Sequence, residues 1–238
     1  MDDQIIVTLA TIPSRIDGCT RAVNTLAPQC DQMLVWLNGL SQPVACSQHA
    51  NVTYHGSPEN IGPRGKFWFH DRMPGYHIVV DDDLIYPDNY VYQMTQHIEK
   101  LQRKMIIGLH GKLFLYRKPP EPMTFKFYRF NDVVSDYQPV HMLGTGVMAY
   151  HSSAFHIGMQ DLQAGKIDDQ VAILAQQQQT PMVVVPHAHD WVLLDEKLAG
   201  IDALHQDMQL KQETSNRIHA FPCWRLYTTD TNDVPNYF

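Results

Sequence analysis

Three consecutive carboxylates, Asp81, Asp82 and Asp83, directly follow an apolar run at 78–80. Because adjacent carboxylates repel one another, a fold that keeps them together needs a compensating cation. Mg²⁺ and Mn²⁺ prefer oxygen ligands and commonly bridge one or two carboxylates to a substrate diphosphate. On an extended chain Asp81 and Asp83 point the same way and Asp82 the opposite way. The pattern therefore predicts a metal held by Asp81 and Asp83, with a solvated acidic loop as the alternative.

The elements that must position these carboxylates alternate between strand and helix patterns. Apolar, β-branched runs predict strands at 4–10, 33–37, 52–55, 77–80 and 105–109. Apolar residues at three- and four-residue steps predict helices at 16–26 and, after a cap at Asp88, at 91–101. Such alternation favours an α/β fold whose mostly parallel sheet has helices on both faces. We expect the loops 11–15, 60–66 and 81–83 to share a cleft at the carboxyl edge of that sheet.

Composition limits the class of protein. The 238 residues include 18 basic and 25 acidic side chains, a formal charge of −7, and 44% are hydrophobic. This balance favours one folded domain and disfavours a protein that coats duplex nucleic acid, so we expect no nucleic-acid partner. The four cysteines form no C-x-x-C pair, which disfavours a zinc ribbon. No basic-apolar leader or membrane-length apolar run is present, which predicts a cytoplasmic protein.

The second half of the chain has a different pattern. Residues 112–130 combine six aromatic with five basic side chains and one acidic one. This segment could bind a sugar acceptor, make a peripheral contact with an anionic membrane, or form an ordinary hairpin or lid; single-stranded nucleic acid is the least favoured of the possibilities. Beyond it we expect an apolar run at 147–150, a helix at 168–179, a strand at 182–185 and a polar helix at 204–217.

Five segments in chain order carry a resemblance to a known family. They read VTLATIPSR, NIGPRGKFWF, VVDDDLIYP, GTGVMAY and KIDDQVAILAQQ, between residues 4 and 186. The ordered set resembles GT-A-fold nucleotide-sugar-dependent glycosyltransferases, in particular small bacterial, family 2-like members that build surface polysaccharide or lipopolysaccharide. The resemblance implies a single GT-A (Rossmann-like) domain over 1–238. Within it, 1–110 would bind the nucleotide sugar, and the smaller acceptor-side portion, 111–238, would bind the acceptor and carry the catalytic base.

The resemblance also implies roles for individual residues. Asp81 and Asp83 would hold Mn²⁺ or Mg²⁺, and Asp82 would contact the ribose or the sugar. A late histidine, His187, would be a third metal ligand, although an ordinary loop histidine is the alternative. Lys66 and Arg64 would lie at the diphosphate, and Thr11, Arg15 and Asn38 at the nucleotide.

A second acidic pair, Asp168-Asp169, opens the predicted helix at 168–179. Either aspartate could simply cap the helix. The resemblance implies instead that this pair supplies the catalytic base, which takes the proton of the acceptor hydroxyl during an inverting transfer. Both Asp168 and Asp169 are candidates for the catalytic site. If one of them caps the helix and the other projects into the cleft, we expect Asp169 to be the base.

The sequence thus predicts a metal-dependent glycosyltransferase that moves a sugar from a nucleoside-diphosphate donor, a UDP-sugar, to a carbohydrate or lipid-linked glycan acceptor. A metal-dependent nucleotidyl- or phosphotransferase is one alternative, although the TIPSR loop lacks glycine and no P-loop motif occurs. A non-catalytic nucleotide- or carbohydrate-binding module is another. A serine hydrolase is disfavoured because no G-x-S-x-G motif is present.

Overall fold

The computed structural model describes residues 3–41, 47–69, 73–115, 124–198, 201, 207–221 and 223–226. Its main sheet is built from β1 (Gln4–Thr11), β2 (Gln32–Asn38), β3 (Val52–Ser57), β4 (Gly75–Val80), β6 (Ile106–Gly108), β9 (Gln138–Val140), β11 (Val147–His151) and β12 (Met182–Val184). The helices are α1 (Ile16–Leu26), α2 (Tyr90–Lys100), α3 (Asp168–Gln177) and α4 (Met208–Ala220). Short 3₁₀ helices are η1 (Pro13–Arg15), η2 (Ala27–Gln29), η3 (Gly62–Phe67) and η5 (Met159–Asp161).

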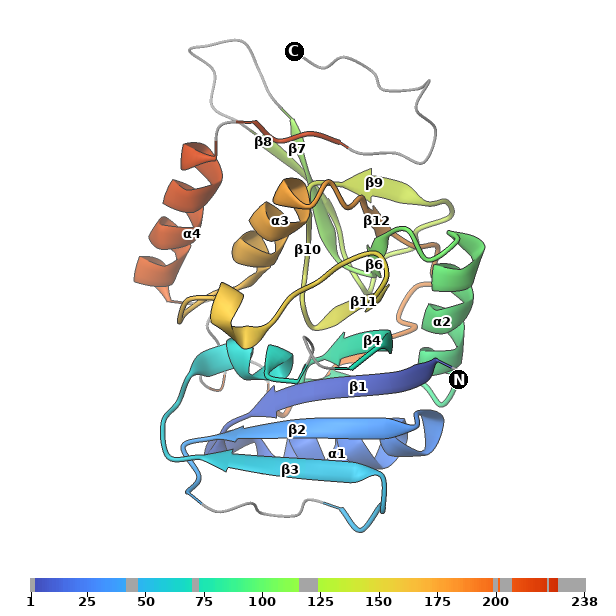
Figure 1. Cartoon of the computed structure of the whole chain (residues 1–238), viewed down its shortest axis with the longest axis vertical. Coiled ribbons are helices and arrows are strands. Elements are labelled where there is room, and N and C mark those ends of the chain that lie inside the picture. The colour runs from blue at the N-terminus through green and yellow to red at the C-terminus, as the bar shows by residue number, and fades with distance from the viewer. Residues whose placement is uncertain are drawn as a thin grey trace.

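The eight strands form one sheet in the order β3-β2-β1-β4-β11-β6-β12-β9 (Figure 1). Strands β1 to β4 run parallel, as do β6 and β12. Strand β11 is antiparallel to both of its neighbours, β4 and β6, and β9 is antiparallel to β12. The α/β class is confirmed, but the sheet is mixed. An apolar run such as 147–150 predicts a buried strand without its direction, which depends on the route of the preceding chain.

Helices cover both faces of this sheet, as expected. Side chains that alternate along a strand point to opposite faces. Ile78 and Ile107 belong to the core that contains residues of α1 and α2, whereas their neighbours Val79 and Ile106 belong to the core that contains residues of α3. These strands are buried on both faces, which explains their continuous apolar sequences.

Two predicted helix starts differ from the structure. The cap of α2 is Asn89 rather than Asp88, and its side chain makes no capping hydrogen bond. Helix α4 starts at Met208, after Asp207, whose Oδ1 accepts a hydrogen bond from Leu210 N (3.0 Å). Residues 204–206 of the predicted helix lie outside the described residues.

The aromatic and basic segment at 112–130 contains a hairpin, one of the expected alternatives. Strand β7 (Gly111–Leu115) lies between β10 (Met142–Leu143) and β8 (Thr124–Tyr128), antiparallel to both. Its connection, 116–123, lies outside the described residues. A second small sheet pairs β5 (Leu84–Ile85) with β13 (Leu193–Leu194). In the part of the chain that the structure describes, no helix combines the length and the apolarity needed to cross a bilayer.

Candidate functional site

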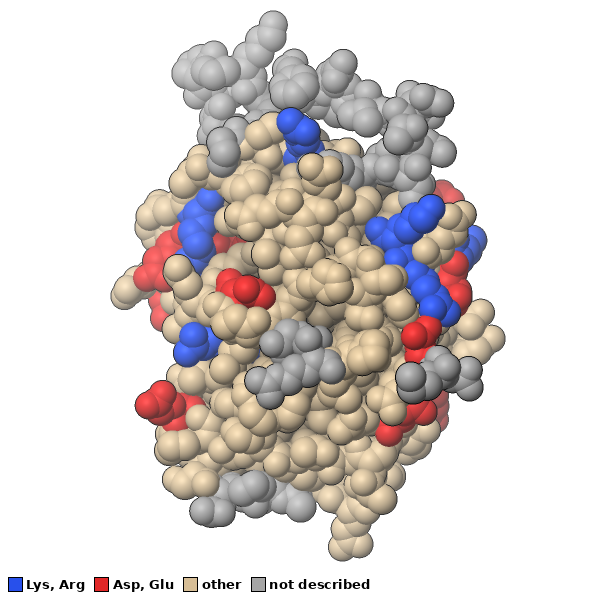
Figure 2. Space-filling model, viewed as in Figure 1, with Lys and Arg blue, Asp and Glu red and all other residues tan. Residues whose placement is uncertain are grey.

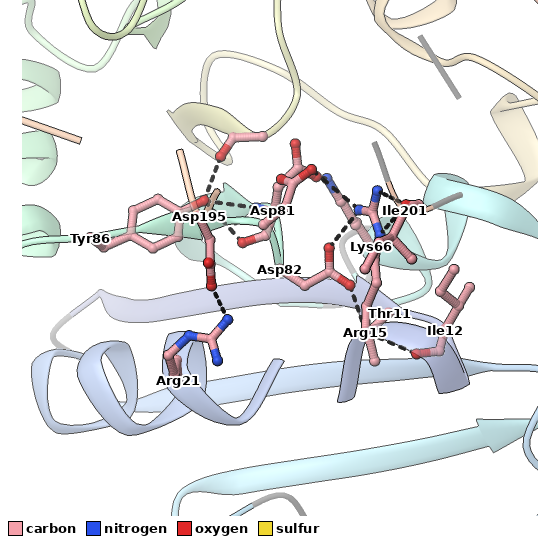
Figure 3. Close-up of polar contacts among 12 residues, drawn as sticks. Thr11, Ile12, Arg15, Arg21, Lys66, Asp81, Asp82, Tyr86, Asp195 and Ile201 are labelled. Atoms are coloured by element: carbon pink, nitrogen blue, oxygen red, sulfur yellow. Dashed lines mark hydrogen bonds and ion pairs between the residues drawn. The ribbon is translucent and has the colours of Figure 1, made fainter. Parts of the chain in front are cut away.

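The adjacent parallel strands β1 and β4 bring Thr11 and the aspartate triplet together. Leu9 pairs with Val80, so the chain leaves both strands at the same edge of the sheet. There the Thr11 hydroxyl donates a 2.6 Å hydrogen bond to Asp82 Oδ2. Asp82 is 4% exposed, and Figure 3 shows its carboxylate directed toward Thr11 and Arg15. The expected proximity of the loops 11–15 and 81–83 is confirmed.

Arg15, at the end of η1, joins two of the three aspartates. Its Nη1 donates to Asp82 Oδ1 (2.9 Å) and lies 3.3 Å from Asp83 Oδ2. The rest of the guanidinium donates to the carbonyl oxygen of Ile201 from Nε (2.9 Å) and Nη2 (2.6 Å). Burial acts to lower the pKa of Arg15, but the charges of Asp82 and Asp83 outweigh it and raise the pKa. Arg15 is therefore a fixed positive charge beside the triplet.

Lys66, in η3, forms an ion pair with Asp81. The lysine side chain is 2% exposed, whereas the Asp81 side chain is 41% exposed. The ammonium group is therefore held inside the protein while the carboxylate that it contacts stays open to a ligand. The loop 60–66 thus reaches the same edge of the sheet as the other two loops, as the sequence predicts.

The triplet retains more negative charge than its contacts neutralise. Two cations, Arg15 and Lys66, contact three carboxylates. Burial and the neighbouring charge of Asp81 raise the pKa of Asp83 to about 6, and burial raises the pKa of Asp82. The uncompensated charge is the feature that would attract a further cation.

The turn Gly144-Thr145-Gly146 joins the two acidic sites. A Cβ atom on Gly146 would lie 1.8 Å from Asp81 Oδ2, so the Asp81 carboxylate packs directly on this glycine. Tyr86 OH accepts a hydrogen bond from Asp81 N (2.8 Å) and lies 2.8 Å from the Gly146 carbonyl oxygen, to which it can donate (Figure 3). The next residue in the turn, Thr145, donates to Asp168 Oδ1 from N (3.0 Å) and Oγ1 (2.8 Å). Asp81 and Asp168 therefore contact adjacent residues of a single turn.

The two residues of the second acidic pair have different environments. Asp169 is fully buried, with an ion pair to Arg217 of α4 and a 3.5 Å contact from the Thr214 hydroxyl to Oδ1. Asp168 is half-buried and faces the 144–146 turn. The predicted role of Asp169 as the base stays a prediction, but its contacts are those of a residue that holds α3 against α4. Asp168 is the carboxylate that contacts the turn on which Asp81 packs.

Asn38 and Arg64 make contacts that join loops of the protein. Asn38 Oδ1 accepts hydrogen bonds from Ile61 N (2.9 Å) and Trp36 Nε1 (3.1 Å), and its Nδ2 donates to Gly62 O (3.3 Å). Arg64 Nη1 donates to the Leu162 carbonyl oxygen (3.4 Å). Asn38 is 2% exposed, so it positions η3 and thereby Lys66. The contact of Asn38 with the nucleotide stays a prediction, and so does the contact of Arg64 with the diphosphate.

His187 does not join the aspartates in a metal site. It is 8% exposed, and its ring nitrogens lie 2.7 Å from Val185 O and 3.2 Å from Arg129 O. Among the described residues, no group of three or more His, Cys, Asp or Glu side chains is arranged to hold a metal ion. The structure therefore gives no support to the predicted histidine ligand, whose ring nitrogens both lie within hydrogen-bond distance of backbone carbonyl oxygens.

The donor chemistry of the triplet nevertheless fits a hard divalent ion. Such an ion needs few protein ligands when a diphosphate supplies further oxygens, and one or two carboxylates are common. Asp81 and Asp83 are the more accessible carboxylates of the triplet, with side chains 41% and 25% exposed. Asp82, bonded to Thr11 and Arg15, is instead a buried support for the other two.

His110 and Tyr86 also belong to the site, although neither lies in a motif that predicts a functional role. The His110 carbonyl accepts a 2.9 Å hydrogen bond from Gly144 N, and a Cβ on Gly144 would lie 3.3 Å from the His110 ring. Burial lowers the pKa of His110, while the nearby charge of Asp168 opposes that change. The signal that could identify His110 is its position just after the predicted strand at 105–109, at the edge where the other site residues gather.

Comparisons with known proteins do not place the chain in a family. No protein-family model matches it, and no curated protein matches it.

Proposed function

We propose that the protein is a metal-dependent glycosyltransferase that transfers a sugar from a UDP-sugar to a glycan acceptor, with inversion at the anomeric carbon. The observation that carries the proposal is that Asp81 and Asp168 contact adjacent residues of the 144–146 turn, Gly146 and Thr145. The triplet offers carboxylates for a divalent ion, and Asp168 offers a carboxylate for proton transfer. The sequence resemblance supports the finer assignment to the GT-A architecture. It also supports a role in surface polysaccharide or lipopolysaccharide synthesis at the inner face of the membrane.

On the donor side, Asp81 and Asp83 would hold Mn²⁺ or Mg²⁺ together with the diphosphate. The ion would neutralise the charge that develops on the departing nucleoside diphosphate. Arg15 and Lys66 would remain close to these phosphates, because both already contact the triplet. Arg15 presents a planar, multidentate donor and Lys66 a point charge.

On the acceptor side, we assign the base to Asp168 rather than to Asp169. Both hydrogen bonds from Thr145 go to Asp168 Oδ1, which leaves Oδ2 to accept the proton of the acceptor hydroxyl. Asp169 is fully buried and paired with Arg217, so an acceptor would have to displace an ion pair to reach it. Thr145 fixes the orientation of the Asp168 carboxylate, which is what general-base catalysis requires.

The donor half of the proposal is tested by thermal unfolding of the full chain with UDP, with Mn²⁺ and with both. We expect stabilisation only when both are present; a ligand at 100 times its Kd adds about 2.7 kcal/mol. Asp81→Asn should abolish the effect, and Asp136→Asn, a change at an exposed aspartate, should leave it intact. Equal stabilisation of wild type and Asp81→Asn would contradict the proposed metal site.

The transfer itself is tested by incubation with a panel of UDP-sugars and Mn²⁺. We expect UDP to be released and the release to stop when a chelator is added. Binding of UDP without turnover would identify a non-catalytic binding module. Release of UMP or pyrophosphate instead of UDP would identify a nucleotidyltransferase.

A further inference from the structure

Three lysines from separate elements approach the acceptor side of the candidate site. Lys112 lies on β7, Lys166 lies two residues before the start of α3, and Lys211 lies on α4. Strand β7 pairs with β10, and the segment before α3 packs against α4. Lys112 pairs with Met142 on β10, the strand that leads into the 144–146 turn. A Cβ on Gly165, beside Lys166, would lie 3.0 Å from the Leu210 side chain, beside Lys211.

The charges of these lysines act on one another. Burial lowers the pKa of Lys166, and the positive charges of Lys112 and Lys211 lower it further. Asp168 and Asp169 oppose this change, but Asp169 already neutralises Arg217. Among the described residues, none of the three lysines belongs to an ion pair. The cluster therefore has an excess of positive charge.

This excess is local. Figure 2 shows the described lysines and arginines of one face in separate groups, several of them beside acidic residues, and not as one continuous basic surface. The aspartate triplet has the opposite imbalance and has its own cations, Arg15 and Lys66. The lysine cluster is thus separate from the cations expected to serve the donor diphosphate.

We propose that the acceptor carries a phosphate group, which the cluster Lys112, Lys166 and Lys211 binds while Asp168 faces the hydroxyl to be glycosylated. This inference rests on the proposed glycosyltransferase function and narrows its acceptor to a phosphorylated glycan. Lysine ammonium groups are strong point-charge partners for phosphate. The Lys112 ammonium also lies 5.5 Å from the centre of the half-exposed Phe127 ring, which provides an apolar surface beside the charge for a sugar ring.

The proposal is tested by calorimetric titration of the full chain with glucose 6-phosphate and with glucose, in a chelator and at low salt. Without metal or nucleotide, the donor site does not contribute. We expect glucose 6-phosphate to bind and glucose to bind at least tenfold more weakly. Lys166→Gln and Lys211→Gln should each raise the Kd for glucose 6-phosphate about fivefold or more. Lys104→Gln, at an exposed lysine in the turn after α2, should leave it unchanged.

Two results would overturn the proposal. One is equal binding of glucose 6-phosphate by wild type and by folded Lys166→Gln and Lys211→Gln proteins, with thermal midpoints as the check on folding. The other is that the protein fails to bind glucose 6-phosphate but sediments with phosphatidylglycerol vesicles, and not with phosphatidylcholine vesicles, in a way that depends on the lysines. That result would identify a membrane-contact surface. Stabilisation by UDP with Mn²⁺ should be the same in wild type and in all these variants. If UDP with Mn²⁺ does not stabilise wild type, the proposed function fails. If UDP with Mn²⁺ stabilises wild type but binding of glucose 6-phosphate does not depend on the lysines, only the acceptor inference fails.

Discussion

The carboxylate of Asp81 packs directly against Gly146. A Cβ on residue 146 would lie 1.8 Å from Asp81 Oδ2 and 2.5 Å from Asp81 Cγ. Both distances are shorter than any nonbonded contact that a Cβ atom can make. The contact follows from the pairing of β4 with β11, in which Val80 lies opposite Val147. Because the two strands are antiparallel, the end of β4 meets the start of β11. Glycine at 146 thus allows the first acidic site to approach the turn that holds the second.

The Gly146→Ala variant should therefore lose metal-dependent nucleotide binding. The added methyl group would displace the Asp81 carboxylate, and such overpacking costs about 1–3 kcal/mol of unfolding free energy. We expect the affinity for UDP with Mn²⁺, measured by calorimetry, to fall at least tenfold in a folded protein. Gly158→Ala is the matched control, because the nearest neighbours of its Cβ are atoms of the Gln160 side chain. Unchanged affinity in Gly146→Ala would show that the position of Asp81 is not important for binding.

The two aspartates that open α3 should separate into a functional and a structural residue. Asp168→Asn keeps an oxygen that can accept the hydrogen bonds from Thr145 but removes the base. Turnover should fall by about 10²–10⁴ with little change in the thermal midpoint. Asp169→Asn removes the charge that neutralises Arg217 and should lower the unfolding free energy by about 1–3 kcal/mol. If Asp169→Asn instead abolishes turnover at unchanged stability while Asp168→Asn remains active, Asp169 is the base.

Replacement of Lys66 should change the affinities for cation and anion in opposite directions. Lys66→Met keeps much of the buried apolar stem and removes the charge that contacts Asp81. We expect Mn²⁺ alone to bind about tenfold more tightly, a change of about 1.4 kcal/mol, and UDP with Mn²⁺ to bind more weakly. Calorimetric titrations with Mn²⁺ and then with UDP measure the two effects. A parallel loss of both affinities would indicate that Lys66 only supports the fold.

Stability should fall as the pH is lowered from 6.5 toward 4, in part because of His141. Burial lowers the pKa of His141 to about 4, and its Nδ1 accepts a hydrogen bond from Phe114 N (3.0 Å). In this interval the unfolded chain binds a proton that the folded protein excludes, so the group contributes a slope of up to about 1.4 kcal/mol per pH unit. Asp83, whose pKa is raised to about 6, acts in the opposite direction. The contribution of His141 is therefore measured as a difference from a variant.

His141→Asn supplies that comparison. It retains an acceptor for Phe114 N but no group that titrates in this range. Urea unfolding at several pH values between 7 and 4.5 should show a lower stability at pH 7 and a shallower decline toward acid than in wild type. Identical slopes in the two proteins would mean that His141 is not the source of the acid sensitivity.

The amino-acid pattern alone determines where strands end and which polar residues follow them. Apolar runs at 4–10 and 77–80 end at Thr11 and at the triplet, and parallel strands place such ends at one edge. The contact between Thr11 and Asp82 and the arrival of Lys66 at Asp81 follow from this rule. These relations are predictable because side-chain periodicity reports burial and strand length directly.

Only the tertiary structure decides the direction of β11 and the division of roles between Asp168 and Asp169. Periodicity shows that residues 147–150 are buried but carries no information on direction, and only the antiparallel pairing brings Gly146 to Asp81. Adjacent aspartates at a helix start are equivalent in sequence. Arg217, 48 residues after Asp169, makes them different by pairing with one of them. Such contacts join segments far apart in the chain, so they become visible only when the packing of whole elements is known.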